Sequence, residues 1–364
     1  MRSAFGHIEK RGEGTWRVWW TAGGQRHSRT VHGTRQEAAK ELAKIQVEMG
    51  GLDRDAKWGE YWELRVEPSL EQLEAHTVDG YMKAWKLLAP VIGERWVSQT
   101  TPRYVEGALK RFTPGQAVKV AKLWRKMCRM AVGDGALHVD PFSAVRVKIP
   151  PKQPKRLLDA SEVPGWMESI RGIKYEPVLL CELGGGLRHE EACALIWEDI
   201  SPWEHRGAVY AVVSVSKALV AVNGRKILKG TKTALSGREV VLGEPFASRL
   251  LELSEGKSGP LLASGVVDRW DAAAAYSSPI TMTHNFKTWC SAHGVEYVRP
   301  AWLRSSFATM QGEAGSPDSL VSLAMGHADG TTKGTHYQQG TRRAGALIAD
   351  MLGELITDNA PENG

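Results

Sequence analysis

The stretch GGGLRHEEACALIWEDI, residues 184–200, combines a glycine run with an arginine that opens an amphipathic helix. Arg188 lies two residues after the last of these glycines, and Ala192 and Leu195 recur at the spacing of an inward-facing helical stripe. The guanidinium of arginine is a permanently charged fork that binds two phosphate oxygens. Glu191, three residues on, shares a helix face with Arg188 and can hold it in place. The string alone fits either a phosphate-binding arginine or a surface salt bridge.

Two further strings add cationic side chains. KTALSGREVVL, residues 232–242, places Lys232 just before the turn of a predicted hairpin and Arg238 at the start of the next strand. A lysine at a hairpin tip is usually solvated, but in a cleft it can protonate a leaving oxygen. RPAWLRSSFATMQGEAG, residues 299–315, predicts a helix of small and apolar residues led by Arg304.

A polar stretch near the end, MGHADGTTKGTHYQQG, residues 325–340, holds His327, His336 and Tyr337 among residues that cannot build a core. It is either an ordinary surface loop or a loop that presents a reactive hydroxyl. Tyrosine is a weak nucleophile at its free pKa, so cationic neighbours must stabilise the phenolate and the phosphorane. The separated arginines, the lysine, the histidines and the late tyrosine are what phosphoryl transfer without a metal needs.

The strings GLRHEE, KTALSGR, LRSSFAT and GHADGTTKGTHY occur in this order, and together they resemble the tyrosine recombinases, specifically the phage integrases. The resemblance covers the whole chain. Residues 76–109 resemble the helical core-binding domain of that family, and residues 1–50 resemble its small arm-binding domain.

The resemblance implies a role for each of five side chains. Arg188 and Arg304 would clamp the scissile phosphate, and His327 would hydrogen-bond to it. Lys232 would protonate the leaving 5′ oxygen. Tyr337 would attack the phosphorus and form a 3′-phosphotyrosyl link.

Supporting roles and one departure also follow from the resemblance. Glu191 and His336 would not contact the phosphate themselves but would support the side chains that do. The family usually has histidine or lysine three residues before the second arginine, where this chain has Ala301, and Arg299 or Trp302 are the candidates to compensate. The resemblance implies neither a metal nor a cofactor.

Residues 1–52 are predicted to form an arm-type DNA-binding domain, a three-stranded sheet followed by one helix. WRVWWTAGG, residues 16–24, alternates as a strand does, and Thr34 with Glu37 forms a capping box that opens the helix. From these residues alone, a generic small sheet with a basic surface is an equal alternative. The side chains expected to contact DNA are Arg17, Arg26 and Arg29.

Residues 56–149 are predicted to form a helical core-binding domain with a basic outer face. Between Arg103 and Arg156 thirteen basic residues stand against three acidic ones, a local balance of +10 in a chain whose net charge is +6. Such a concentration suits a polyanion, although charge runs are usually solvated faces. KIPPKQPKR, residues 148–156, is a stiff interdomain linker. The DNA contacts expected here are Lys119, Lys122, Arg125, Lys126, Arg129, Lys152 and Lys155.

Residues 157–364 are predicted to form a mixed, mainly helical catalytic domain with a small antiparallel sheet and a C-terminal helix. GAVYAVVSVSKALV, residues 207–220, and GREVVL, residues 237–242, supply strands, and Asn223-Gly224 is a hairpin turn. RRAGALIADMLGEL, residues 342–355, is the terminal helix. The fold class expected for the whole chain is multidomain α+β.

Composition narrows the possible compartments and ligands. The 364 residues contain no run of eighteen apolar positions, and the N-terminus lacks the apolar stretch of a signal peptide, so we expect the cytoplasm, here of a bacterial host cell. The four cysteines have no metal-ligand spacing. Cys193 rather than histidine stands four residues after His189, which excludes a helical zinc motif.

The leading hypothesis is a phage or prophage integrase that acts on double-stranded DNA at core and arm attachment sites. The resemblance implies a homotetramer on DNA, with a host DNA-bending protein and an excisionase as further candidate partners. One alternative is a Xer-like recombinase that resolves dimers, although such enzymes usually lack an extra N-terminal domain. The other is a catalytically weak DNA-binding regulator with the same fold, for which Ala301 is the only support.

Overall fold

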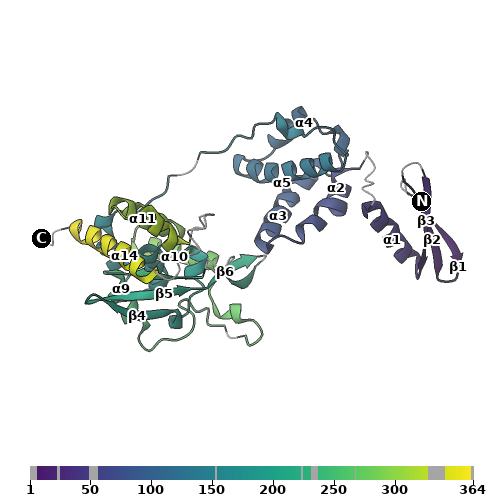
Figure 1. The fold of residues 1–364 in the computed structure, drawn as a ribbon. Coiled ribbons are helices and arrows are strands. Elements are labelled where there is room, and N and C mark those ends of the chain that lie inside the picture. The colour runs from purple at the N-terminus through teal and green to yellow at the C-terminus, as the bar shows by residue number, and fades with distance from the viewer. Residues whose placement is uncertain are drawn as a thin grey trace. The chain divides into compact units, whose positions relative to one another are not determined.

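The computed structural model describes residues 6–22, 25–48, 56–151, 154–222, 224–230, 237–266, 268–326 and 341–361. The chain divides into two compact units, Met1–Lys152 and Gln153–Gly364, whose elements are labelled in Figure 1. None of the helices in the described stretches combines the length and the apolar composition that a membrane span requires.

The first unit begins with an antiparallel sheet in the order β1 (Gly6–Gly12), β2 (Thr15–Ala22), β3 (Gln25–His32), followed by α1 (Arg35–Glu48). Alternation along β2 turns Val18 toward α1, where it is buried with Ala38 and Leu42. The predicted capping box is present. The main-chain nitrogen of Glu37 donates to Thr34 Oγ1 at 3.3 Å, and that of Thr34 donates to Glu37 Oε2 at 2.6 Å.

After α1, the first unit continues with the α-helices α2 (Trp58–Tyr61), α3 (Ala75–Ile92), α4 (Pro102–Leu109) and α5 (Pro114–Gly133). Thr113 and Gln116 form a capping box at the start of α5, and Pro114 occupies its first turn. Trp124 is fully buried on the inner stripe of α5. Asp134, just past the helix, accepts hydrogen bonds from Arg65 at 2.6 and 2.9 Å. α5 is thus fixed at both ends.

The second unit consists of helices around two small antiparallel sheets. Its helices are α6 (Val163–Ser169), α7 (Glu176–Gly185), α8 (His189–Ala192), α9 (Phe246–Ser254), α10 (Pro279–His293), α11 (Pro300–Glu313), α12 (Asp318–Met325) and α14 (Thr341–Asp358). Its strands are β4 (Ile200–His205), β5 (Ala208–Val215), β6 (Lys217–Val222), β7 (Arg225–Gly230) and β8 (Arg238–Leu242). One sheet has the order β4-β5-β8, and β6 pairs with β7. The multidomain α+β class predicted from the sequence is confirmed.

The pairing of β8 differs from the sequence prediction. The string from Lys232 to Arg238 predicted a hairpin, but β8 pairs with β5, with Val240 opposite Val213, whereas β7 pairs with β6. The apolar inner face of β8 explains the choice, because Val240 is 2 % exposed and packs in the main core. β8 therefore brings Arg238 to the edge of the core rather than to a solvated hairpin.

α7 is the central helix of the second unit, and all of its residues are buried. It ends at Gly186, whose φ of 63° lies in the left-handed region that favours glycine. A Cβ at this position would lie 2.5 Å from the ring of Phe307 in α11. Gly186 therefore has two roles: it ends α7, and it allows α11 to pack closely. Leu187 and Arg188 follow it in the sequence.

Candidate active site

The C-terminal end of α12 accepts hydrogen bonds from three arginines. The last carbonyl groups of a helix lack partners within the helix, and here guanidinium groups supply them. The contacts are Arg238 Nε to Ala324 O at 2.6 Å, Arg304 Nη2 to Met325 O at 2.8 Å and Arg188 Nη2 to Gly326 O at 2.9 Å. The arginines come from β8, α11 and the residue that caps α8. The main-chain oxygens of residues 324–326 thus bind arginine side chains from three segments that are distant in the sequence.

Glu191 joins two of these arginines. Its Oε1 accepts from Arg188 Nη1 at 2.6 Å, and its Oε2 accepts from Arg238 Nη2 at 2.8 Å and from the main-chain nitrogen of Arg188 at 3.0 Å. Burial would raise the pKa of this carboxyl, but the hydrogen bonds from Arg238 and Arg188 outweigh it and lower the pKa. The side chain of Arg188 is 40 % exposed and that of Arg238 is 5 % exposed. Arg188 therefore faces solvent while Arg238 braces it through Glu191.

Arg304 holds its positive charge close to two other guanidinium groups. Its Nη1 donates to the main-chain oxygen of Gly186 at 2.6 Å. Burial, together with the charges of Arg188 and Arg238, lowers the pKa of Arg304 to about 10. Arg304 thus stays charged at neutral pH, in a place where charge is unfavourable. A bound anion would relieve that repulsion, so these side chains form a site suited to a phosphate group.

The structure brings together only part of the predicted set. Arg188, Glu191 and Arg304 meet at the end of α12, and Ala301 lies exposed one turn before Arg304. Other predicted residues lie outside the described residues, namely Lys152, Lys232, His327, His336 and Tyr337. Among the residues that the structure describes, no group of three or more His, Cys, Asp or Glu side chains is arranged to hold a metal ion.

Arg238 is the residue that sequence reasoning missed. The sequence places it at the start of a strand but indicates no role for it, because its partners are a main-chain oxygen and a carboxylate on another helix. The available signal is an arginine at the start of a strand that continues, after Glu239, with the apolar residues Val240 and Val241. A charged side chain at such a place needs a buried partner.

The predicted DNA contacts of α5 lie along its outer side. Lys119, Lys122 and Arg129 are exposed, and Arg125 and Lys126 are half-buried. Arg125 lies over the ring of Phe142, with its guanidinium carbon 5.0 Å from the ring centre. In the linker, Lys155 Nζ donates to Ser305 Oγ at 2.8 Å.

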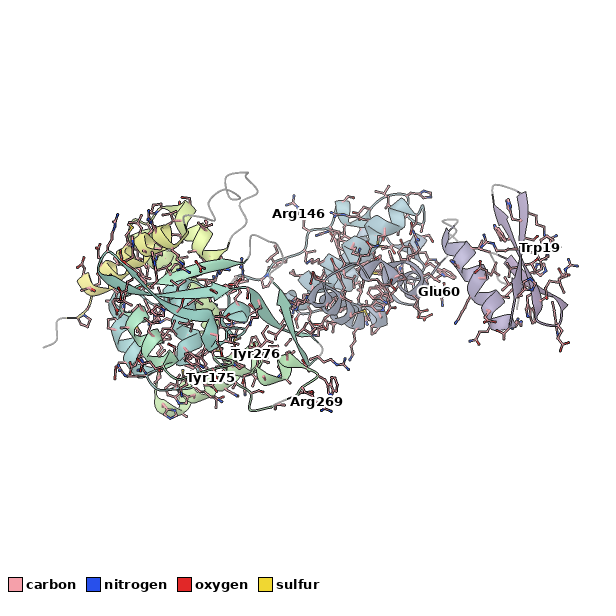
Figure 2. The ribbon with its side chains drawn as sticks, turned by 60° about the horizontal axis from the view of Figure 1, so that its bottom comes forward. Trp19, Glu60, Arg146, Tyr175, Arg269 and Tyr276 are labelled. Atoms are coloured by element: carbon pink, nitrogen blue, oxygen red, sulfur yellow. The ribbon has the colours of Figure 1, made fainter. Side chains whose placement is uncertain are left out.

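The predicted contacts of the N-terminal sheet fall on two faces. Trp19 lies on the face of the sheet turned away from α1 (Figure 2). Arg17 and Arg26 flank it, with guanidinium carbons 5.2 and 4.6 Å from its ring centre. Arg29 pairs with Val18 across the strands and therefore shares the helix-covered face. Its guanidinium donates to Glu41 of α1 at 2.6 Å. The structure thus brings Arg17 and Arg26 together and separates Arg29 from them.

The fold is that of DNA-bound recombinases. A structure of the Tn1549 transposon integrase in complex with a circular intermediate DNA matches with a TM-score of 0.62 and 16% identity, over 80% of this chain and 98% of that one. A lambda integrase tetramer bound to a Holliday junction matches with a TM-score of 0.54 and 17% identity, over 89% and 96%. No match was found among curated proteins. These likenesses, at 16% and 17% identity, show the fold.

Family membership follows from the sequence profile. The model of the Phage integrase family matches residues 148–343, more than half of the chain. The chain therefore belongs to the phage integrase family, and it is a DNA-binding, site-specific recombinase.

Proposed function

We propose that this recombinase is a phage-type integrase that cleaves and rejoins DNA through a 3′-phosphotyrosyl intermediate with Tyr337 as nucleophile. The observation that carries the proposal is the convergence of three guanidinium groups on the main-chain oxygens of residues 324–326. His327 follows directly in the sequence, and Tyr337 follows ten residues later. The residues that accept these hydrogen bonds therefore directly precede, in the sequence, the segment that contains the proposed nucleophile.

In this proposal, side chains of the protein perform every catalytic role, without a metal ion or a cofactor. The Tyr337 hydroxyl loses its proton to solvent as its oxygen attacks the phosphorus. The bond from phosphorus to the 5′ oxygen breaks, and Lys232 gives that oxygen a proton. Arg188 and Arg304 neutralise the charge that develops on the phosphorane oxygens, and His327 donates a hydrogen bond to one of them. Attack by a 5′ hydroxyl on the phosphotyrosine reverses these steps and rejoins the strand.

Separate surfaces serve separate DNA segments in this proposal. The exposed basic side chains of α5 contact phosphates of the core site, supported by the linker lysines Lys152 and Lys155. The Trp19 face of the sheet, with Arg17 and Arg26, contacts an arm site. We propose a homotetramer as the active assembly on DNA in the bacterial cytoplasm, with a host DNA-bending protein and an excisionase as accessory partners.

Two alternatives remain distinct from this proposal. A Xer-like enzyme would perform the same chemistry without needing arm sites, so it would recombine core sites after removal of residues 1–52. A catalytically weak regulator would bind DNA without forming a covalent adduct. The exposed Arg188 favours a catalytic role, because the buried Arg238 and Glu191 hold it toward solvent.

A nicked suicide substrate tests the proposal, because the short fragment with the free 5′ hydroxyl diffuses away after cleavage. Without that hydroxyl the strand cannot be rejoined, so the covalent adduct accumulates. The wild type should give an adduct that survives denaturing electrophoresis, and Tyr337→Phe should give none while binding DNA as before. Tyr297→Phe removes a hydroxyl elsewhere in the same unit and should retain the adduct. An adduct in the Tyr337→Phe variant would assign the nucleophile to another residue. DNA binding by a wild type that forms no adduct would support the regulator.

A further inference from the structure

His189, the first residue of α8, is buried between α7 and α10 and contacts both helices. Its Nδ1 lies 2.7 Å from Oε1 of Glu182 in α7. Its Nε2 lies 3.0 Å from the main-chain oxygen of Pro279 and 3.1 Å from Oγ1 of Thr283, both in the first turns of α10. Because Arg188 immediately precedes His189, this ring fixes the point from which the Arg188 side chain extends.

The partners of the ring determine where its protons lie. A carbonyl oxygen only accepts, so Nε2 carries a proton directed at Pro279. An ionised Glu182 also only accepts, so Nδ1 carries the second proton. Glu182 is fully buried, and burial raises the pKa of its carboxyl, whereas the hydrogen bond and the charge of His189 act to lower that pKa. Its Oε2 has no hydrogen-bond partner among the described residues, so an ionised Glu182 depends on His189 as its counter-ion. Burial opposes a charge on His189, but contacts with Cys193 and Glu182 raise the pKa of His189 to about 11.

We propose that His189 is an imidazolium held by the Glu182 carboxylate, and that this buried ion pair positions Arg188. The proposal rests on the proposed function, because it concerns the arginine assigned to the scissile phosphate. Separating the members of a buried ion pair leaves each charge uncompensated, which is energetically unfavourable. The pair therefore keeps His189 in contact with Glu182. It fixes the start of α8 to α7 and α10 at once, whereas Glu191 holds the far end of the Arg188 side chain.

The other titratable groups near this pair do not replace Glu182 as a counter-ion. The thiol of Cys193 lies 3.9 Å from Nδ1, and burial raises its pKa, so it stays neutral. Tyr297 stays a neutral phenol because burial raises its pKa. Thr283 is uncharged, and Glu190 is exposed to solvent. The charge of His189 is therefore controlled by Glu182.

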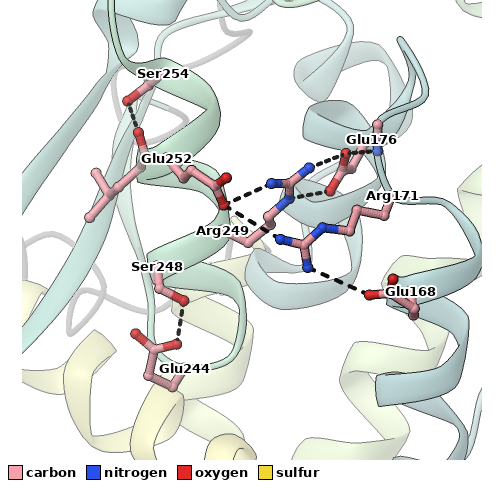
Figure 3. A network of polar contacts seen from close by, with 10 residues as sticks. Glu168, Arg171, Glu176, Glu244, Ser248, Arg249, Glu252 and Ser254 are labelled. Carbon is pink, nitrogen blue, oxygen red and sulfur yellow. Dashed lines mark hydrogen bonds and ion pairs between the residues drawn. The ribbon is translucent and has the colours of Figure 1, made fainter.

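A second buried carboxylate on α7 provides a matched control. Glu176, at the opposite end of the helix from Glu182, accepts from Arg249 of α9 at 2.6 and 3.0 Å (Figure 3). Glutamine at either position removes one buried negative charge from the same helix. Once the carboxylate has been replaced, only the partner of Glu182 can lose its proton near neutral pH, because arginine stays charged throughout.

Nuclear magnetic resonance of ¹⁵N-labelled protein tests the protonation state without DNA, with the signal assigned by its loss in His189→Gln. In the wild type both ring nitrogens of His189 should carry protons from about pH 5 to pH 8, a range that spans the ordinary histidine pKa of about 6.5. In Glu182→Gln, burial without a counter-ion should lower the pKa of His189 below that value, and the Arg188 Nε signal should shift as the ring titrates. Glu176→Gln should leave both signals as in the wild type. A neutral His189 ring in the wild type overturns the proposal.

The pH profile of strand cleavage tests the positioning role. In Glu182→Gln the fold favours the neutral form of the His189 ring. Activity should therefore be present above the lowered pKa of His189 and should be lost as the pH falls through that pKa. Relative to the wild type, the cleavage rate should then fall about tenfold per pH unit below that pKa. Glu176→Gln should keep a constant ratio to the wild type. Equal pH profiles for the two variants overturn the proposal. A wild type without any adduct contradicts the proposed function instead, and the Arg188 Nε signal still decides whether the pair positions Arg188.

Discussion

Arg238 donates to both oxygens of the Glu191 carboxylate, at 2.8 Å from Nη2 to Oε2 and 3.3 Å from Nη1 to Oε1. Both side chains are 5 % exposed, so this contact lies inside the domain although it serves an exposed residue. Through Glu191 it fixes Arg188, and through its own Nε it fixes the end of α12. Arg238 thus connects the contact between Glu191 and Arg188 to the end of α12.

Arg238→Gln should impair cleavage more than DNA binding, because it releases Glu191 and the end of α12 without changing an exposed basic group. Breaking a buried ion pair costs about 3–5 kcal/mol, so urea unfolding should also show a loss of stability. Arg249→Gln breaks the buried pair with Glu176, remote from the site, and serves as the control. If both variants lose cleavage equally under conditions where both are folded, Arg238 has no special role in the site.

Gly326→Ala should lower both stability and cleavage. Gly326 has a φ of 66°, and a Cβ there would lie 2.8 Å from Nη1 of Arg238. The left-handed backbone alone costs a non-glycine residue about 1–2 kcal/mol. Gly312→Ala in α11 meets nothing within 4 Å and should stabilise the helix by about 0.5–1 kcal/mol. Thermal unfolding and adduct formation would measure both effects, and a Gly326→Ala variant as active and stable as the wild type would contradict the geometry.

Replacing Lys122, Arg125, Lys126 and Arg129 of α5 by alanine should weaken binding to specific and random duplexes alike. Neutralising a phosphate releases counterions, so the log–log slope of affinity against salt should fall by about one unit for each phosphate that is no longer bound. The same charge change at Arg171, Lys174, Lys257 and Lys287 should leave the slope unchanged. An unchanged slope in the α5 variant would mean that this face is only solvated. Selective loss of affinity at one base pair would instead assign Arg125 to base readout in the major groove.

Cleavage should persist in excess EDTA. The charge that develops on the phosphorane is neutralised by Arg188, Arg304 and Lys232, so a divalent ion is not needed for that role. Adduct formation on the suicide substrate would be measured with and without the chelator, and with magnesium added back. Loss of the adduct in EDTA followed by rescue with magnesium would contradict the mechanism.

Local patterns in the sequence predict local structure well. The capping box at Thr34 and the contact between Arg188 and Glu191 depend on residues three apart, so spacing alone indicates them. The pairing of β8 with β5 depends instead on competition between distant strands.

Contacts with main-chain oxygens and exact strand register are beyond the reach of such patterns. The convergence on residues 324–326 joins side chains to peptide oxygens, whose positions no residue type reveals. Basic character alone groups Arg29 with Arg17, yet the register with Val18 turns Arg29 toward α1. One residue of register decides the face of a strand, and composition does not specify it.

The three arginines at the end of α12 make its length as important as its composition. Successive residues of an α-helix are rotated by about 100° and displaced by about 1.5 Å along the axis. Deleting a single residue within Asp318–Met325 would therefore turn all three carbonyl groups away from Arg188, Arg238 and Arg304 together. Side chains on the outer surface of this helix can therefore be exchanged without moving the three carbonyl groups, whereas one inserted or deleted residue changes the direction of all of them.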